Sequence, residues 1–191
     1  MLIYVAGFWL VDFSSSLPTQ TSYVGTDIAP QLFPKHLGNQ FTFAAQSVTE
    51  DWPPEWDGSF DLVHQRLVLG TLSPAAAEEA VRRLVSLIQP GGYIQLVEAD
   101  MSADMVDAEK TPAQYKFAKT TEEFMAATGS NSRPGTCLRS WLENCKLEDV
   151  EERCFILEIG PRNKDPVLGQ KGSQNVLSVL SNFKKAAQSK L

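Results

Sequence analysis

The segment over residues 60–100 constrains the fold of this chain more than any other part of the sequence. It begins with an apolar run over 60–69 that is typical of a buried strand. Ser73 and Pro74 then provide an N-cap and a first-turn proline, and apolar residues recur behind them at helical spacing. A Pro-Gly-Gly sequence is expected to end this helix before a second strand over 93–98. Strand, helix and strand in so short a span predict a βαβ unit with parallel strands and a right-handed crossover.

The rest of the chain continues this alternation of strands and helices. Strands are predicted over 1–5, 22–28, 40–47 and 150–159, and helices over 8–13, 111–128, 138–144 and beyond Gly172. Alternation of this kind favours an open α/β fold, a mostly parallel sheet with helices on both faces. The chain shows no repeat, low-complexity tract or linker, which predicts a single domain over residues 1–191.

Composition limits the kinds of binding partner and the cellular compartment that we expect for this protein. Hydrophobic residues make up 43% and charged residues 21% of the 191 residues, which suits one well-buried domain. The net charge of −6 argues against a nucleic-acid partner, because such proteins usually present a basic face. The three cysteines lack metal-like spacing and indicate a reducing compartment. The longest apolar stretch, near residues 1–11, is too short to span a membrane, so we expect a cytoplasmic protein without a membrane partner.

In an open parallel sheet, ligands bind beyond the carboxyl ends of the strands, so the residues at those ends are the candidates for a site. Asp27 ends one predicted strand, where a carboxylate can accept both hydroxyls of a ribose. A turn or cap residue ahead of Pro30 is an equal alternative for Asp27. Ser47 ends the next strand and is a further candidate.

His64 and Glu98 are the candidates for proton transfer. His64 lies in the second half of the strand over 60–69, and a side chain with a pKa near ~6.5 can move protons there. A buried, hydrogen-bonded histidine is the commoner outcome at such a position. Arg66 would share the face of His64 and either bind a carboxylate or form an ion pair. Glu98 leaves the following strand either as a general base or as a solvated strand end.

Other chemistries lack their sequence motifs. The chain shows no nucleophile elbow, no Walker loop, no CxxC pair and no HExxH motif. Hydrolase, phosphate-transfer and metal-dependent functions are therefore disfavoured, and no metal ligands are predicted.

Four stretches of sequence carry a family resemblance, over residues 7–12, 24–34, 58–66 and 89–100. The last two are the most specific, and the likeness continues to residues 150–161. Together they resemble the class I S-adenosylmethionine-dependent methyltransferases, in particular the filamentous-fungal branch that includes the regulator LaeA and tailoring methyltransferases of secondary metabolism. The resemblance implies a Rossmann-like sheet of six or seven mostly parallel strands, with the late strand over 150–159 pairing antiparallel.

The resemblance also implies an activity and a set of cofactor contacts. The activity would be methyl transfer from S-adenosyl-L-methionine to an oxygen or nitrogen of a small-molecule substrate, an in-line displacement that depends on placing the nucleophile close and aligned. By resemblance, Asp27 would hold the ribose and Ile28 would pack on the adenine. The remaining implied contacts are Ser47 and Val48 at the adenine edge, His64 and Gln65 beside the methionine part, and Gly7 in the glycine-rich loop.

The chain departs from the family in that glycine-rich loop. Gly7 corresponds to its last glycine, whereas Ile3, Tyr4, Val5 and Ala6 stand where the family has the others, so the chain resembles a domain truncated at this motif. Glycines in the loop let the backbone approach the cofactor closely. The alternative to an active enzyme is thus an impaired methyltransferase-like binding or scaffolding protein. Such a protein would have a protein partner. By analogy with regulatory family members, a nuclear location is the alternative to a cytoplasmic one.

Overall fold

The structure, a computed structural model, describes residues 2–4, 8–17, 20–35 and 37–188. It divides the chain into two compact units, Met1–Val150 and Glu151–Leu191. The single domain over residues 1–191 stays a prediction. Residues 151–158, expected to extend the sheet, are exposed and outside any strand.

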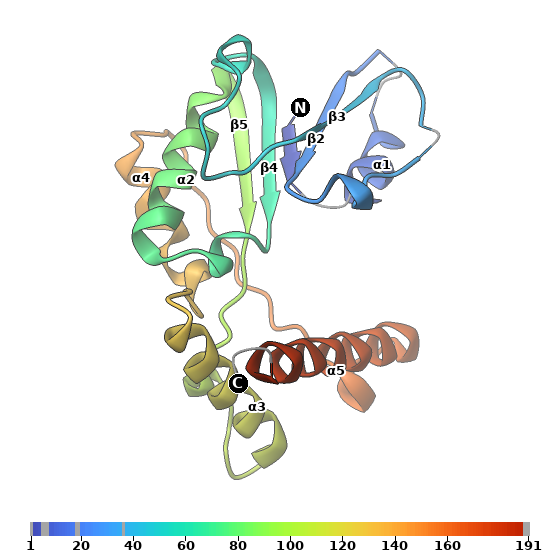
Figure 1. The fold of residues 1–191 in the computed structure, drawn as a ribbon, viewed down its shortest axis with the longest axis vertical. Coiled ribbons are helices and arrows are strands. Elements are labelled where there is room, and N and C mark those ends of the chain that lie inside the picture. Colours follow the sequence, from blue (N-terminus) through green and yellow to red (C-terminus); the bar gives the residue numbers. More distant parts are fainter. Residues whose placement is uncertain (1, 5–7, 18–19, 36, 189–191) are drawn as a thin grey trace. The chain divides into compact units, whose positions relative to one another are not determined.

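Unit 1 is built on a parallel sheet (Figure 1). Within the described residues the sheet has five strands in the order β3-β2-β1-β4-β5, and all four strand pairs are parallel. The strands are β1 (Leu2–Tyr4), β2 (Tyr23–Asp27), β3 (Phe41–Ala45), β4 (Phe60–Arg66) and β5 (Ile88–Val97). The central position of β1 and the reversal of strand order beside it are the hallmark of a doubly wound sheet, with its ligand site at the carboxyl edge.

Helices cover both faces of this sheet. On one face, α1 (Phe8–Ser14) packs Leu10 against β2 and β3, in a cluster that includes Tyr23 and Phe43. On the other face, α2 (Pro74–Ser86) buries one side against Val63, and α4 (Leu138–Asn144) adds Trp141 to the same core. Adjacent strand residues alternate between the two clusters, as the pleat requires.

Helix α2 confirms the central βαβ unit, but its end differs from the prediction. Ser73 Oγ accepts a hydrogen bond from the Ala76 N–H, so the predicted N-cap is present. The helix ends at Ser86, and β5 already begins at Ile88, before the Pro-Gly-Gly sequence. Those residues instead form a bulge, since pairing shifts between Phe60–Ile88 and Leu62–Tyr93. Gly91 has a φ of 82° in the bulge, a conformation that favours glycine.

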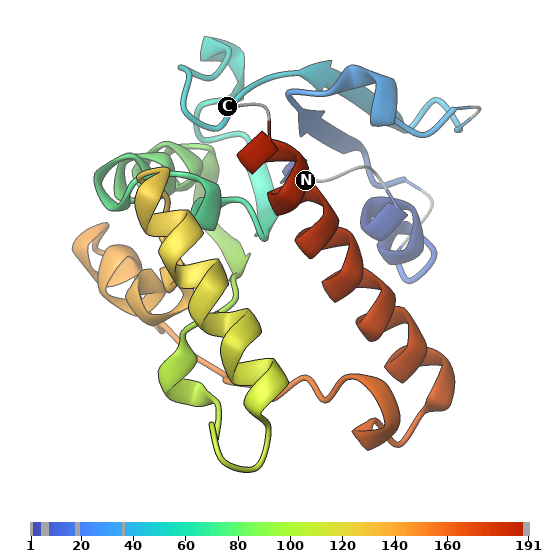
Figure 2. The same cartoon turned by 60° about the horizontal axis from the view of Figure 1, so that its bottom comes forward.

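The chain after β5 completes unit 1 and then forms unit 2. After β5, a loop with the 3-10 turn Ala103–Met105 leads to α3 (Pro112–Ala127), whose end is followed by Gly129 in the left-handed conformation. Unit 2 holds a 3-10 turn, Gly160–Arg162, and the long helix α5 (Pro166–Gln188), which Figure 2 shows along most of its length. The structure has α5 beginning earlier than the residues after Gly172 that the sequence predicts.

The predicted antiparallel strand over 150–159 is wrong for the described structure. These residues form no strand, and Phe155, Ile156 and Leu157 are 85%, 91% and 81% exposed. Their apolar sequence indicates a strand, but a strand also needs a partner edge, which sequence pattern does not supply. The parallel α/β sheet itself is confirmed, with five strands instead of six or seven. Among the described residues, no helix combines the length and apolarity needed to cross a membrane.

Packing of α1 on the sheet depends on a glycine, which yields a first prediction. A Cβ atom at Gly25 would lie 2.6 Å from Cε1 of Phe43 and 3.4 Å from Cδ2 of Leu10. We expect Gly25→Ala to lower the free energy of unfolding by about 1–3 kcal/mol through overpacking. Phe43→Leu replaces the ring with a smaller side chain. The free energy of unfolding should therefore fall less when Gly25→Ala is added to Phe43→Leu than when it is made in the unaltered chain. Urea denaturation measures both values, and an additive double variant would contradict the proposed clash.

Candidate functional site

The carboxyl ends of the strands form the candidate site, and Asp27 stands at the end of β2. Its backbone pairs with Ala45 of β3, and its carbonyl accepts a hydrogen bond from the Gln46 N–H at 3.1 Å. Oδ1 of Asp27 accepts a hydrogen bond from the Ala29 N–H at 2.8 Å, which fixes the carboxylate at the start of the next loop. Thus Asp27 has the predicted strand-end position and also makes the turn contact that was its alternative.

The predicted adenine contacts differ in accessibility. Ile28 is 67% exposed, so its side chain is available to a ligand. Ser47 is half-buried, and its hydroxyl contacts the Thr49 hydroxyl at 2.7 Å and accepts a hydrogen bond from the Thr49 N–H. Val48 is buried in the core beneath α2 and therefore supports this loop from below.

His64 is enclosed on the α1 face of the sheet. Its ring stacks on Trp9 with ring centroids 3.8 Å apart and planes inclined by 7°. The residue is 2% exposed, and within the described part of the chain neither ring nitrogen has a hydrogen-bond partner. Trp9 stacks in turn on Phe13, so His64 ends an aromatic column under α1. The sequence points to Trp9 only as an apolar helix residue, and its contact with His64 depends on the crossover that brings distant segments together.

Burial lowers the pKa of His64 to about 4. The side chain of Gln95 opposes this shift, although it does not reach hydrogen-bond geometry with the ring, and the charge of Arg66 lowers the pKa further. His64 is therefore neutral at physiological pH, where it packs and does not carry charge.

Gln65 and Glu98 are joined on the opposite face of the sheet. Gln65 is fully buried, and its Nε2 donates a hydrogen bond to Oε1 of Glu98 at 2.8 Å. The same oxygen accepts hydrogen bonds from the N–H groups of Val68 and Leu69, each at 2.8 Å. Glu98 is thus bound to the loop that follows β4. His64 and Glu98, the two candidate bases, therefore have different surroundings, and a role in proton transfer for either residue stays a prediction.

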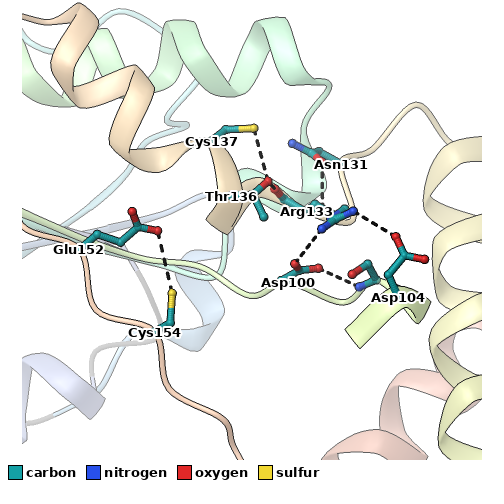
Figure 3. A network of polar contacts seen from close by, with 9 residues as sticks. Asp100, Asp104, Asn131, Arg133, Thr136, Cys137, Glu152 and Cys154 are labelled. Atoms are coloured by element: carbon teal, nitrogen blue, oxygen red, sulfur yellow. Dashed lines mark hydrogen bonds and ion pairs between the residues drawn. The ribbon is translucent and has the colours of Figure 1, made fainter. Parts of the chain in front are cut away.

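A second polar network holds the loops beyond β4 and β5 together (Figure 3). Arg133 forms ion pairs with Asp100 and Asp104, both at 3.4 Å. Burial alone would raise the pKa of Asp100, but the hydrogen bond from the Ser102 N–H at 2.9 Å, the nearby Ser102 side chain and the charge of Arg133 outweigh burial and hold that pKa below its usual value. The Asn131 N–H donates to the carbonyls of Gly70 and Leu72, which ties this loop to the end of β4. The sequence marks Asn131–Gly135 only as a loop, since no local pattern reveals these distant partners.

The residues at this edge fit a nucleoside-type cofactor. Asp27 offers a carboxylate next to the exposed apolar side chain of Ile28. Thr26 and Gln65 lie in register on either side of Tyr4, and each has a buried oxygen without a partner among the described residues. Gly7 lies outside the described residues. No group of three or more possible metal ligands occurs in the described part of the chain.

The fold is Rossmann-like, and solved proteins with a similar fold include methyltransferases. Human N-acetylserotonin methyltransferase in complex with SAM matches with a TM-score of 0.53 at 19% identity, covering 78% of this chain and 42% of that one. An O-methyltransferase family protein from Burkholderia thailandensis matches with a TM-score of 0.55 at 21% identity, covering 81% and 47%. LepI in complex with SAM matches with a TM-score of 0.54 at 12% identity, covering 76% and 36%.

Sequence comparison gives more similar relatives. The N-methyltransferase gliN of Aspergillus fumigatus is 39% identical over 183 residues, which are 95% of this chain and 64% of that protein. The N-methyltransferase sirN of Leptosphaeria maculans is 36% identical over 181 residues, covering 95% and 63%. The chain therefore spans less than two thirds of the length of these relatives. No protein-family model matches it.

The burial of His64 predicts a pH-dependent stability. Because folding lowers its pKa from 6.5 to about 4, the unfolded state binds the proton more readily than the folded state. Stability from this group is complete above pH 6.5 and is lost as pH falls towards 4, by up to about 1.4 kcal/mol per pH unit. We expect His64→Phe, which keeps the stack on Trp9, to flatten the profile of unfolding free energy over this range. The other histidine of the sequence is present in both proteins, so an unchanged slope would contradict the assignment.

Proposed function

We propose that the chain is the core of an S-adenosyl-L-methionine-dependent methyltransferase acting on a small molecule of fungal secondary metabolism. The observation that carries the proposal is Asp27, a carboxylate fixed at the carboxyl end of β2 beside the central strand of the sheet. A carboxylate at this place suits the two hydroxyls of a ribose. The fungal relatives named as N-methyltransferases, and solved neighbours holding SAM, support the same activity.

The proposed cofactor contacts follow the strand ends. Asp27 would accept from the ribose, Ile28 would pack on the adenine, and Ser47 would lie at the adenine edge with Val48 supporting its loop. Gln65 would contact the amino-acid part of the cofactor. Gly7 would be the glycine of the loop that approaches the cofactor. The bound cofactor would supply an electrophilic methyl group, and this chain would orient the acceptor and exclude water.

We propose nitrogen as the methyl acceptor. The relatives gliN, sirN and tcpN of Claviceps purpurea are all named N-methyltransferases, and they cover 95% of the chain. A nitrogen nucleophile with a free lone pair needs no strong base before attack. This agrees with the surroundings of the two predicted bases, since His64 is enclosed under α1 and Glu98 is bound to a loop. We also propose that the chain belongs to the methyltransferase branch that includes LaeA and that it is located in the cytoplasm.

Ligand-dependent unfolding tests the cofactor. At about 100 times its dissociation constant, S-adenosylhomocysteine should add about 2.7 kcal/mol to the stability of the folded chain. For a chain of this size that is roughly 5–10 °C in the midpoint of thermal unfolding. We expect Asp27→Ala to abolish the shift, because it removes the proposed ribose acceptor. Asp61→Ala, a carboxylate on β4 near the opposite edge, is the matched control and should leave the shift intact.

The outcome separates the two functions weighed for this chain. A shift that depends on Asp27 supports the methyltransferase. A folded chain that shows no shift at millimolar ligand overturns it and supports the impaired, partner-binding alternative. The reason for that alternative is that positions 3–6 carry side chains where the family has glycines.

Acceptor type can be measured directly. We expect the chain to methylate the amine nitrogen of a small-molecule substrate and to leave the matched hydroxyl analogue unmodified. Mass spectrometry of the product, together with the release of S-adenosylhomocysteine, measures the transfer. Methylation of the hydroxyl analogue alone would contradict the nitrogen assignment.

A further inference from the structure

A single oxygen of Glu98 receives three hydrogen bonds at the carboxyl edge of β4 and β5. The donors are Nε2 of Gln65 and the backbone N–H groups of Val68 and Leu69, all at 2.8 Å. A carboxylate with three short hydrogen bonds is held firmly, because bonds to an ionised acceptor are the strong ones. Glu98 thus joins the end of one strand to the loop that follows its neighbour.

The bond to Glu98 determines which way the Gln65 amide points. An ionised carboxylate only accepts hydrogen bonds, so the amide nitrogen of Gln65 must face it. The amide oxygen, Oε1, is therefore turned away from Glu98. Oε1 is buried and has no partner among the residues that the structure describes. The end of β4 consequently offers a buried hydrogen-bond acceptor that has no partner among the described residues.

The loop after β4 is shaped around the same carboxylate. Leu67 has a φ of 54°, a left-handed conformation, and Val68 returns to the right-handed region with φ −116° and ψ −42°. Successive residues of this kind turn their N–H groups into a concavity that binds an anion. Here the anion belongs to the chain itself, and Leu69 is anchored below as a fully buried core residue.

We propose that Glu98 is a positioning residue that fixes the Gln65 amide so that its oxygen accepts a hydrogen bond from the cationic amino group of the cofactor. This inference rests on the proposed function. It assigns Glu98 a role through Gln65 and the loop over 67–69, and not a proton transfer. It also assigns Gln65 one end of the cofactor, the amino-acid end.

The first experiment compares ligands with and without that end. Gln65→Met removes the acceptor with little change in volume, and calorimetry measures binding of S-adenosylhomocysteine and of 5′-methylthioadenosine, which lacks the amino-acid part. We expect a loss of about tenfold to hundredfold for the first ligand, the range of a hydrogen bond to a charged group. Binding of the second should stay within about twofold, since a general disturbance of the fold would weaken both ligands.

The chain offers a matched control on the same two strands. Nε2 of Gln89 on β5 donates to Oδ1 of Asp61 on β4 at 2.6 Å, which is the same kind of bond at the opposite end. Gln89→Met should leave the affinity for both ligands unchanged.

Removal of the carboxylate tests the positioning role. In Glu98→Leu, Nε2 of Gln65 loses its acceptor and the amide is no longer fixed, so we expect S-adenosylhomocysteine to bind about tenfold more weakly, with 5′-methylthioadenosine within about twofold. Glu98→Gln keeps an oxygen that can accept the same three hydrogen bonds and should bind S-adenosylhomocysteine within about threefold of the unaltered chain.

The outcomes are distinct. A folded Glu98→Leu variant that binds S-adenosylhomocysteine as the unaltered chain does would overturn the proposal. So would a Gln65→Met variant that binds as the unaltered chain does, or one that loses both ligands equally. If the unaltered chain is folded and binds neither ligand, the methyltransferase function itself fails, and this inference fails with it.

Discussion

Parallel pairing of the strands is the constraint on which the rest of unit 1 depends. Every connection between parallel neighbours must cross from one edge of the sheet to the other, so all carboxyl ends meet at the same edge. That edge gathers the Asp27 turn, the Glu98 contacts and the Arg133 network, although these residues are far apart in sequence. At the amino edge, the pair formed by Gln89 and Asp61 joins β4 and β5 directly. We expect the ligand site at the carboxyl edge, because the polar side chains there lie in loops that can face a ligand.

The pleat of β4 imposes the second constraint, because adjacent residues must point to opposite faces. His64 enters the aromatic column under α1, and Gln65 enters the face that α2 and α4 cover. The two residues that the family resemblance places together beside one ligand therefore have different surroundings. A stacked, neutral ring contributes packing, whereas an amide with a committed nitrogen contributes a directed acceptor. Of the two, Gln65 is the stronger candidate for a ligand contact.

Local sequence signals predicted the elements of unit 1 well. The Ser73-Pro74 start of α2 and the apolar run over 60–69 each act within a few residues. Signals that depend on distant partners failed. The apolar run over 150–159 predicted a strand but could not supply an edge, and the Pro-Gly-Gly sequence predicted a helix stop although it forms a bulge in β5.

The candidate site shows the same limit at the level of side chains. Strand-end position was enough to find Asp27 and Glu98, since topology alone brings such residues to the ligand edge. Position could not distinguish a base from a structural anion, and that difference lies in the donors around the carboxylate. For Glu98 these donors are two backbone N–H groups and an amide, and all three bond to one oxygen. A carboxylate so surrounded is well suited to fixing its neighbours. The chemistry of this edge therefore lies in how Glu98 orients Gln65, and in what Asp27 can hold beside it.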